Sequence, residues 1–373
     1  MSEEIYSPGL EGVIAGETAI STIAGGLQYR GYSVESLADH CCFEEVAYLV
    51  LEGELPNADQ LGSFREQLNN AMFINAEIVD LLGKLPDGGS MMDVMRTGAS
   101  LLAHWDPETG DNSHAANLRK SIRLLAQLPV VMAARERLRQ GKKPVEPDAE
   151  LSLAANVLWQ LFGEKPSDDY TKAMDVSLIL YAEHEYNAST FTSRVVASTL
   201  ADLHSAICAA IGALKGPLHG GANERVMEVL EEVGSGDRAA AWVREALDNK
   251  RRIMGFGHRV YKTGDPRAVY LKTLCAQLAA GNPASEDMER IAETIEGVVT
   301  SEKGLPPNLD WPSARLYHYM GLPIDLYTPL FVVSRVVGWA AHVIEQHDNN
   351  RLIRPRARYT GELDRTWTPI DQR

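Results

Sequence analysis

Cysteine is scarce in this chain, and the four residues that occur are poorly placed for cross-linking: Cys41, Cys42, Cys208 and Cys275. Cys41 and Cys42 are adjacent, a spacing that rarely forms a disulfide without strain. We therefore expect all four thiols to be reduced.

Basic residues are in the minority. The 373 residues include 36 Lys and Arg against 51 Asp and Glu, which gives a formal net charge of −15. The longest basic run is Lys250-Arg251-Arg252, so the chain lacks the basic surface that nucleic-acid binding needs. We expect no nucleic-acid partner. The acidic excess favours solubility, and an anionic substrate would have to be attracted by a local cluster of arginines.

Long apolar runs are nearly absent. The run 326–344 approaches the length of a membrane span, but Ser334, Arg335 and His342 interrupt it, which is typical of a core helix. The N-terminal Met1-Ser2-Glu3-Glu4 lacks the charged-then-apolar pattern of a secretory signal and the Arg-rich character of a transit peptide. We expect no membrane contact and a cytoplasmic location.

Alternating strand patterns are also nearly absent, and helical signals dominate. Hydrophobic residues make up 45% of the chain, enough for one large core or two unequal ones. One helix is expected from about Phe43 to Gly53, and Asn57 with Gln60 fits a capping box that opens the next. Ser90 is a candidate cap for a helix over 91–102.

The second half of the chain contains helix signals next to chemically active residues. Small residues are dense over 190–214, which lets helices approach closely, and a Gly-Pro pair at 216–217 ends this segment. A new amphipathic helix is predicted over 225–233. Asp265-Pro266 is typical of a helix N-cap followed by a first-turn proline, with Arg267 in the first turn.

Three short segments punctuated by glycine or proline contain the most informative residues. They are Gly216-Pro217-Leu218-His219-Gly220-Gly221-Ala222-Asn223-Glu224, Gly255-Phe256-Gly257-His258-Arg259 and Asn308-Leu309-Asp310-Trp311-Pro312. Backbone beside glycine bends sharply and can lie close to a ligand, so His219 and His258 look presented rather than packed. Two imidazoles and one carboxylate are the minimum set for taking a proton from carbon while hydrogen-bonding two carbonyl oxygens. The set predicts an enzyme that makes a carbon-carbon bond.

Two of the charged residues have structural interpretations as well. Pro312 predicts a helix that starts just after Asp310, where a carboxylate is favoured, so spacing alone supports a helix cap as well as a catalytic acid. Arg335 could be a buried ion-pair partner. Because an unpaired buried charge is costly, a ligand carboxylate is a sensible counterion for it.

Several short sequence motifs of this chain, taken together, resemble those of citrate synthases in their order and approximate spacing. The resemblance rests on Gly9–Val13, Glu17–Ser21, Tyr29–Tyr32, His184–Phe191, Pro217–Asn223, Gly255–Lys262, Asp265–Arg267, Ser334-Arg335 and Ile353–Ala357, which span nearly the whole chain. It implies an all-α, two-domain citrate synthase-like helical fold with an interdomain cleft. A large domain over 1–215 would be rejoined by 323–373, with a smaller domain over 216–322 inserted between them.

The resemblance also implies roles. Asp310 would be the base on the acetyl methyl group of acetyl-CoA, neutral His219 would donate to the thioester carbonyl, and His258 would polarise the keto carbonyl of oxaloacetate. Hydrolysis of the citryl thioester would then release citrate and CoA. Apart from the coenzyme A thioester, which is a substrate, neither cofactor nor metal is implied.

Substrate contacts follow in the same way. Four residues match the oxaloacetate and citrate contacts of the family: His184, Arg267, Arg335 and Arg354. Guanidinium groups suit carboxylates because they form paired hydrogen bonds. Arg354 is expected to come from the partner subunit of a homodimer. For CoA, Lys262 is the phosphate candidate and Met254, Gly255, Phe256 and Gly257 could contact the adenine side, with 250–252 as a weaker option.

Alternatives remain open at this point. A 2-methylcitrate synthase using propionyl-CoA would carry the same motifs, since one methylene is discriminated at only about 1–3 kcal/mol. A non-catalytic helical scaffold would be expected to lose at least one of His219, His258 and Asp310, and all three are present. The Gly-Leu-Glu-Gly string begins at Gly9, so we expect a dimer without the N-terminal extension that some larger bacterial relatives use for NADH control.

Overall fold

The computed structural model describes residues 6–257, 261 and 264–373. Within that part the chain has sixteen α-helices and one small three-stranded antiparallel sheet, so the predicted all-α class is confirmed. Two predicted site residues, His258 and Lys262, lie outside the described residues.

The first ten helices precede the elbow that carries His219. Their bounds are α1 Val34–His40, α2 Phe43–Glu52, α3 Ala58–Ala71, α4 Ala76–Gly83, α5 Met91–Trp105, α6 His114–Arg139, α7 Leu153–Phe162, α8 Asp168–Tyr181, α9 Ala188–Ala197 and α10 Leu203–Leu214. Six more follow: α11 Ala222–Val233, α12 Gly236–Asp248, α13 Pro266–Ala279, α14 Pro283–Lys303, α15 Asp310–Tyr319 and α16 Tyr327–Asp348. Short 3-10 turns occur at Pro8–Leu10, Ile324–Leu326 and Ile370–Gln372.

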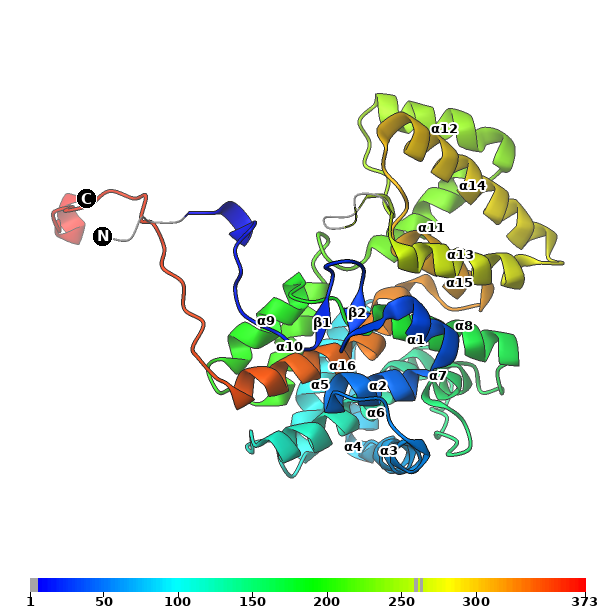
Figure 1. The fold of residues 1–373 in the computed structure, drawn as a ribbon. Coiled ribbons are helices and arrows are strands. Elements are labelled where there is room, and N and C mark those ends of the chain that lie inside the picture. The colour runs from blue at the N-terminus through cyan, green and yellow to red at the C-terminus, as the bar shows by residue number, and fades with distance from the viewer. Residues whose placement is uncertain (1–5, 258–260, 262–263) are drawn as a thin grey trace.

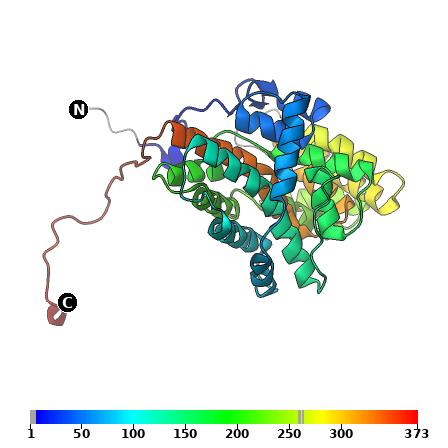
Figure 2. The ribbon, with the colours of Figure 1, turned by 90° about the horizontal axis from the view of Figure 1, so that it is seen from below.

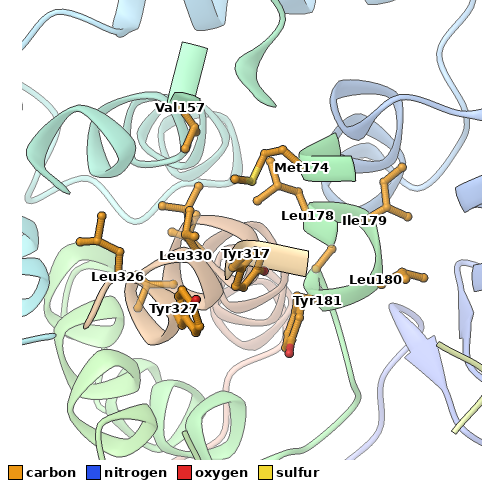
Figure 3. Close-up of a cluster of buried hydrophobic side chains, with 14 of the residues drawn as sticks. Val157, Met174, Leu178, Ile179, Leu180, Tyr181, Tyr317, Leu326, Tyr327 and Leu330 are labelled. Carbon is orange, nitrogen blue, oxygen red and sulfur yellow. The ribbon is translucent and has the colours of Figure 1, made fainter. Parts of the chain in front are cut away.

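Helix α16 forms the centre of the larger group of helices. It packs against α2, α5, α6, α8, α9 and α10, and nearly all of its side chains are buried, including the polar side chains of Ser334, Arg335 and His342. One cluster of this core joins α7, α8, α15 and the start of α16, with Tyr317 and Tyr327 among the aliphatic side chains (Figure 3).

Helices α11 to α15 form a second group. In Figure 1 they lie together above the remaining helices, with α12 against α14 and α13 against α15. They contact the first group through α1, α8 and α16. The predicted inserted domain, 216–322, contains this group, and its exact boundaries stay a prediction.

Local capping signals explain where several helices begin and end. Helix α2 ends at Gly53 in the left-handed region, at φ 96°, which glycine adopts without strain. The predicted capping box of Asn57 and Gln60 is confirmed, with both reciprocal hydrogen bonds at 2.9 Å. Ser90 caps α5 as predicted, although that helix continues beyond the predicted end at residue 102, to Trp105.

One predicted helix start needs correction, and two features were not predicted. The segment 190–214 forms two helices, because residues 198–202 turn between α9 and α10 and Asp202 caps the second. Helix α11 begins at Ala222, three residues before the predicted start, with Gly221 as its N-cap. Strands do occur: β1 Ser21–Thr22, β2 Gln28–Tyr29 and β3 Tyr32–Ser33 pair in that order, and each is too short to show alternation.

The segment after α16 extends away from the helices. Figures 1 and 2 show the segment after α16 trailing outward, without helix or strand until its last turn. Large apolar side chains are exposed along it, including Tyr359 at 68%, Leu363 at 74% and Trp367 at 75%. Such exposure is unusual for side chains of this size.

One helix, Ile324–Asp348, is long and apolar enough to cross a membrane by length and composition. Its apolar window is 94% buried inside the protein, as expected of a core helix. The prediction that this run packs in the core is confirmed.

Candidate active site

A cavity of about 560 Å³ brings together most of the predicted site residues. Those that line it are His184, His219, Met254, Gly255, Phe256, Gly257, Arg267, Asp310 and Arg335. They come from both groups of helices, and the volume is in the range of a small-molecule site.

His219 lies in the elbow between α10 and α11, as predicted. The elbow is tight: a Cβ added at Gly220 would meet the carbonyl oxygen of Leu214 at 2.2 Å. Gly221 follows in the left-handed region, at φ 73°. Two successive glycines therefore let the chain reverse immediately after the histidine, which places the imidazole at the cavity wall.

The protonation of His219 follows from its partner, Ser189. The backbone N–H of Ser189, in the first turn of α9, donates to Nε2 of His219 at 3.2 Å, and the Ser189 hydroxyl lies 2.8 Å from the same atom. Because a backbone N–H can only donate, Nε2 accepts and the ring proton is on Nδ1. Burial, and then the charge of Arg335, lower the pKa of His219 to about 4. The ring is thus a neutral hydrogen-bond donor at neutral pH.

Asp310 is the first residue of α15, which confirms the predicted position at a helix N-terminus. Its backbone N–H donates to Oδ1 of Asn308 at 3.1 Å. The hydroxyl of Tyr181 donates to its Oδ1 at 2.9 Å. Burial raises the pKa of Asp310, and the hydrogen bond from Tyr181 opposes this rise. A carboxylate with a raised pKa is a stronger base than an exposed one.

The loop 254–257 is joined to the segment that precedes Asp310. Gly257 donates to the carbonyl of Pro306 at 2.8 Å, and Asn308 donates to the carbonyl of Gly255 at 2.9 Å. A Cβ at Gly255 would lie 2.9 Å from Trp311, so only glycine fits this approach. The backbone of the predicted CoA loop is therefore hydrogen-bonded directly to the segment that positions the carboxylate of Asp310.

Arg335 is buried, at 2% exposure, and lines the cavity from α16. Its Nε donates to the carbonyl of Tyr181 at 2.6 Å, and its guanidinium lies over the Phe331 ring at 4.6 Å. Burial lowers the pKa of Arg335 to about 10, with Glu183 opposing the shift, so the group is charged at neutral pH. Both interpretations of Arg335 from the sequence, as an ion-pair partner and as a ligand for a carboxylate, keep support. Glu183 is a nearby acid that favours its charged form, and the Arg335 side chain also borders the cavity.

Arg267 is held by an acid of its own segment. Helix α13 starts at Pro266 with Asp265 as N-cap, as predicted. The guanidinium of Arg267 forms a two-point contact with Asp265, at 3.0 Å from Nε and 2.9 Å from Nη2. Burial disfavours its charge, yet the ion pair with Asp265 outweighs burial and raises the pKa of Arg267. Because Asp265 accepts from Nε and Nη2 of Arg267, fewer of its N–H groups are available to a substrate carboxylate than the sequence alone suggests.

Among the predicted site residues that the structure describes, Arg354 is the one that does not line the cavity. It is exposed, in the segment after α16 that trails away from the helices. Arg354 therefore does not line the cavity of its own chain, and its role in a partner's site stays a prediction. Among the described residues, no cluster of His, Cys, Asp and Glu is placed to hold a metal ion.

Three partners of the site residues were given no role from the sequence, and two of them, Tyr181 and Phe331, also line the cavity. Tyr181 bonds Asp310, Ser189 bonds His219, and Phe331 packs against both Tyr181 and His219, with ring centroids at 4.5 and 6.4 Å. The spacing of Phe331, one helical turn before Arg335, was the available signal for the last.

Comparison with known proteins is consistent with this geometry. The sequence family described as citrate synthase, C-terminal domain, matches residues 9–356. Citrate synthase 2 of Bacillus subtilis is 47% identical over 367 residues, which cover 98% of each chain. This chain belongs to the citrate synthase family. Another family member, 2-methylcitrate synthase 2 of Corynebacterium glutamicum, is 46% identical over 375 residues, covering 98% of this chain and 97% of the relative.

Solved structures of the citrate synthase family share the fold. The citrate synthase of Thermoplasma acidophilum, in a ternary complex with carboxymethyl coenzyme A and oxaloacetate, matches with a TM-score of 0.93 at 34% identity, covering 99% of both chains. That of Thermotoga maritima matches with a TM-score of 0.89 at 39% identity, again over 99% of both. The all-α, two-domain citrate synthase fold expected from the sequence is thus confirmed.

Proposed function

We propose that this chain is a citrate synthase, which condenses acetyl-CoA with oxaloacetate and water to give citrate and CoA. The observation that carries the proposal is that Asp310, His219 and Arg335 line one cavity of about 560 Å³. A base, a neutral hydrogen-bond donor and a buried cation are the groups that this reaction requires.

The first step, removal of a proton from the thioester, is assigned to Asp310 as base and His219 as hydrogen-bond donor. The carboxylate of Asp310 takes a proton from the methyl carbon of the thioester, and the C–H electron pair forms the C=C bond of the enolate. The developing oxygen receives a hydrogen bond from Nδ1–H of His219, whose other nitrogen is engaged by Ser189. The low pKa of His219, about 4, keeps that donor neutral. Neither group performs both tasks, because the base must lack the proton that the donor offers.

Oxaloacetate carries two carboxylates and a keto group. Arg335 has its two Nη groups without a hydrogen bond to the described residues, so they suit a substrate carboxylate. His184 and Arg267 border the same cavity. His258 is assigned to the keto oxygen, and Arg354 from a second copy of this chain to the remaining carboxylate, by family resemblance.

CoA is assigned to the loop Met254–Gly257, with Lys262 as phosphate ligand. Arg252, from the run that the sequence offered as a weaker option, also lines the cavity and supplies a further cation. The reaction needs no cofactor beyond the thioester. The cytoplasmic location and the lack of nucleic-acid and membrane partners stay predictions from the sequence.

A second candidate is 2-methylcitrate synthase with propionyl-CoA. It is supported by the relative of that name from Corynebacterium glutamicum, at 46% identity, against 47% for the citrate synthase of Bacillus subtilis. The two activities differ by one methylene, for which the pocket can discriminate by about 1–3 kcal/mol.

A thiol-release assay with oxaloacetate and either acyl-CoA tests both candidates. We expect a larger kcat/KM with acetyl-CoA than with propionyl-CoA. A preference for propionyl-CoA would assign 2-methylcitrate synthase, and no CoA release with either thioester would refute a condensing enzyme. The Asp310→Asn variant is the control, since its activity should fall by about 10²–10⁴-fold.

A further inference from the structure

Tyr181 contacts two groups of the site at once. It is the last residue of α8 and is 2% exposed. Its hydroxyl donates to Oδ1 of Asp310 at 2.9 Å, and its main-chain carbonyl accepts from Nε of Arg335 at 2.6 Å. Asp310 and Arg335 lie on different helices, α15 and α16. Tyr181 is therefore a common partner of the carboxylate and the guanidinium.

The hydrogen bonds of the Tyr181 hydroxyl have a fixed direction. An ionised carboxylate only accepts, so the single proton of the tyrosine is directed at Asp310. The hydroxyl of Ser313, 2.8 Å away, must then donate to the tyrosine oxygen. Burial, and then the charge of Asp310, raise the pKa of Tyr181, so it keeps this proton. No hydrogen bond from the described residues reaches the other oxygen of Asp310, Oδ2.

The ring of Tyr181 is fixed as well. Figure 3 shows it at the edge of the buried cluster, with its hydroxyl pointing away from the labelled aliphatic side chains. On its other side it packs against Phe331, with ring centroids 4.5 Å apart. A ring packed in this way costs little further entropy when its hydroxyl binds the carboxylate.

We propose that Tyr181 is a positioning residue for the general base: its hydroxyl holds Oδ1 of Asp310, so that Oδ2 receives the substrate proton, and its carbonyl aligns Arg335. The proposal rests on the proposed function, in which Asp310 is the base. In the step itself the substrate C–H bond breaks, the proton goes to Oδ2, and the electron pair forms the C=C bond of the enolate, whose oxygen accepts the hydrogen bond from His219. The tyrosine proton stays on the tyrosine throughout.

The Tyr181→Phe variant tests this role, because it removes the hydroxyl and keeps the ring. The hydrogen bond favours the ionised form of Asp310, so its loss should raise the pKa of that group. The ionised form is the active one. We therefore expect the acid limb of the kcat/KM profile to move to higher pH by about one unit, and kcat to fall about 10-fold.

Two further readouts separate positioning from folding. If proton removal becomes slower, the kinetic isotope effect with methyl-deuterated acetyl-CoA should increase, while the KM for oxaloacetate stays nearly unchanged. Tyr317→Phe is the matched control: Tyr317 is also buried, and its hydroxyl bonds Ser177 outside the cavity. That control should leave the pH profile and the isotope effect as in the wild type.

The outcomes distinguish the two proposals. If Asp310→Asn abolishes turnover and Tyr181→Phe leaves the acid limb and the isotope effect unchanged, the role of Tyr181 is refuted and the base stands. If Asp310→Asn keeps near wild-type turnover, the proposed function fails first. A pH shift of the same size in Tyr317→Phe would also overturn the proposal, since any lost buried hydroxyl would then suffice.

Discussion

The backbone amide of Ser189 donates to Nε2 of His219, 30 residues further along the chain. This one contact assigns the ring proton to Nδ1 and leaves a neutral donor at the cavity. Removal of the imidazole in His219→Ala should lower kcat by about 10²–10³-fold, the usual loss for one oxyanion donor. Thiol release measured with saturating oxaloacetate checks this, and activity close to that of the wild type would exclude His219 as the donor.

The same histidine should make stability depend on pH. Its pKa is about 4 in the folded protein, below the ordinary value of 6.5, so between these values the unfolded chain binds a proton that the folded chain lacks. The free energy of unfolding therefore falls as the pH falls through this window, by about 2 kcal/mol from pH 7 to pH 5. Urea unfolding at both pH values should show a smaller drop for His219→Gln. His114→Gln, at a side chain that is 55% exposed, should behave like the wild type.

How much the sequence predicted depends on how local each contact is. Helix ends were read correctly at Gly53, at Asn57 and at Asp265-Pro266, because their hydrogen bonds join residues two to four positions apart. The turn between α9 and α10 was missed because it contains neither glycine nor proline. The cap at Asp202 was the only local signal there.

Contacts across the site could not be read in this way. Tyr181 and Asp310 are 129 residues apart, and no spacing rule joins them. The pairing of Asp265 with Arg267 is local, but the sequence indicated only the capping role of the acid. Asp310 and His219 were located by their resemblance to family motifs, because such motifs reflect residues that come together in the folded members of the family. The partners that set their protonation became visible only with the packing of α8 and α9.

Arg335 should act mainly on oxaloacetate. The Arg335→Lys variant keeps a charge but loses the planar fork that binds a carboxylate at two points. We expect the KM for oxaloacetate to rise by about 10–100-fold, with a small change in the KM for the acyl-CoA. Steady-state kinetics and calorimetric titration with oxaloacetate measure both. The control is Arg251→Lys, at an exposed pair with Glu232. Equal effects of the two substitutions would contradict a substrate role.

A buried network beneath the site should contribute to stability. Glu183 is 0% exposed, accepts from Ser21 at 3.0 Å and lies 2.9 Å from Nε2 of His342. Burial raises its pKa, but His342 and Arg335 outweigh burial and lower it, so the group is ionised.

The Glu183→Gln variant removes this charge and leaves Arg335 without its buried counterion. We expect the free energy of unfolding to fall by about 3 kcal/mol, measured by urea denaturation. Glu232→Gln breaks an exposed pair with Arg251 and should cost less than about 1 kcal/mol. If the two variants lose the same stability, the buried charge of Glu183 contributes no more to stability than the exposed pair of Glu232 with Arg251.

Arg354 offers the sharpest test of a shared active site. It is exposed in its own chain and outside the cavity, so Arg354→Ala should inactivate a site only if a second copy supplies the arginine. In a heterodimer of Arg354→Ala with Asp310→Asn, one site would contain the intact Asp310 of the first chain and the intact Arg354 of the second. Random pairing of co-expressed chains makes half of the dimers mixed, so about a quarter of wild-type activity should return. Each variant alone should be nearly inactive, and no recovery on mixing would mean that every protomer has a self-contained site.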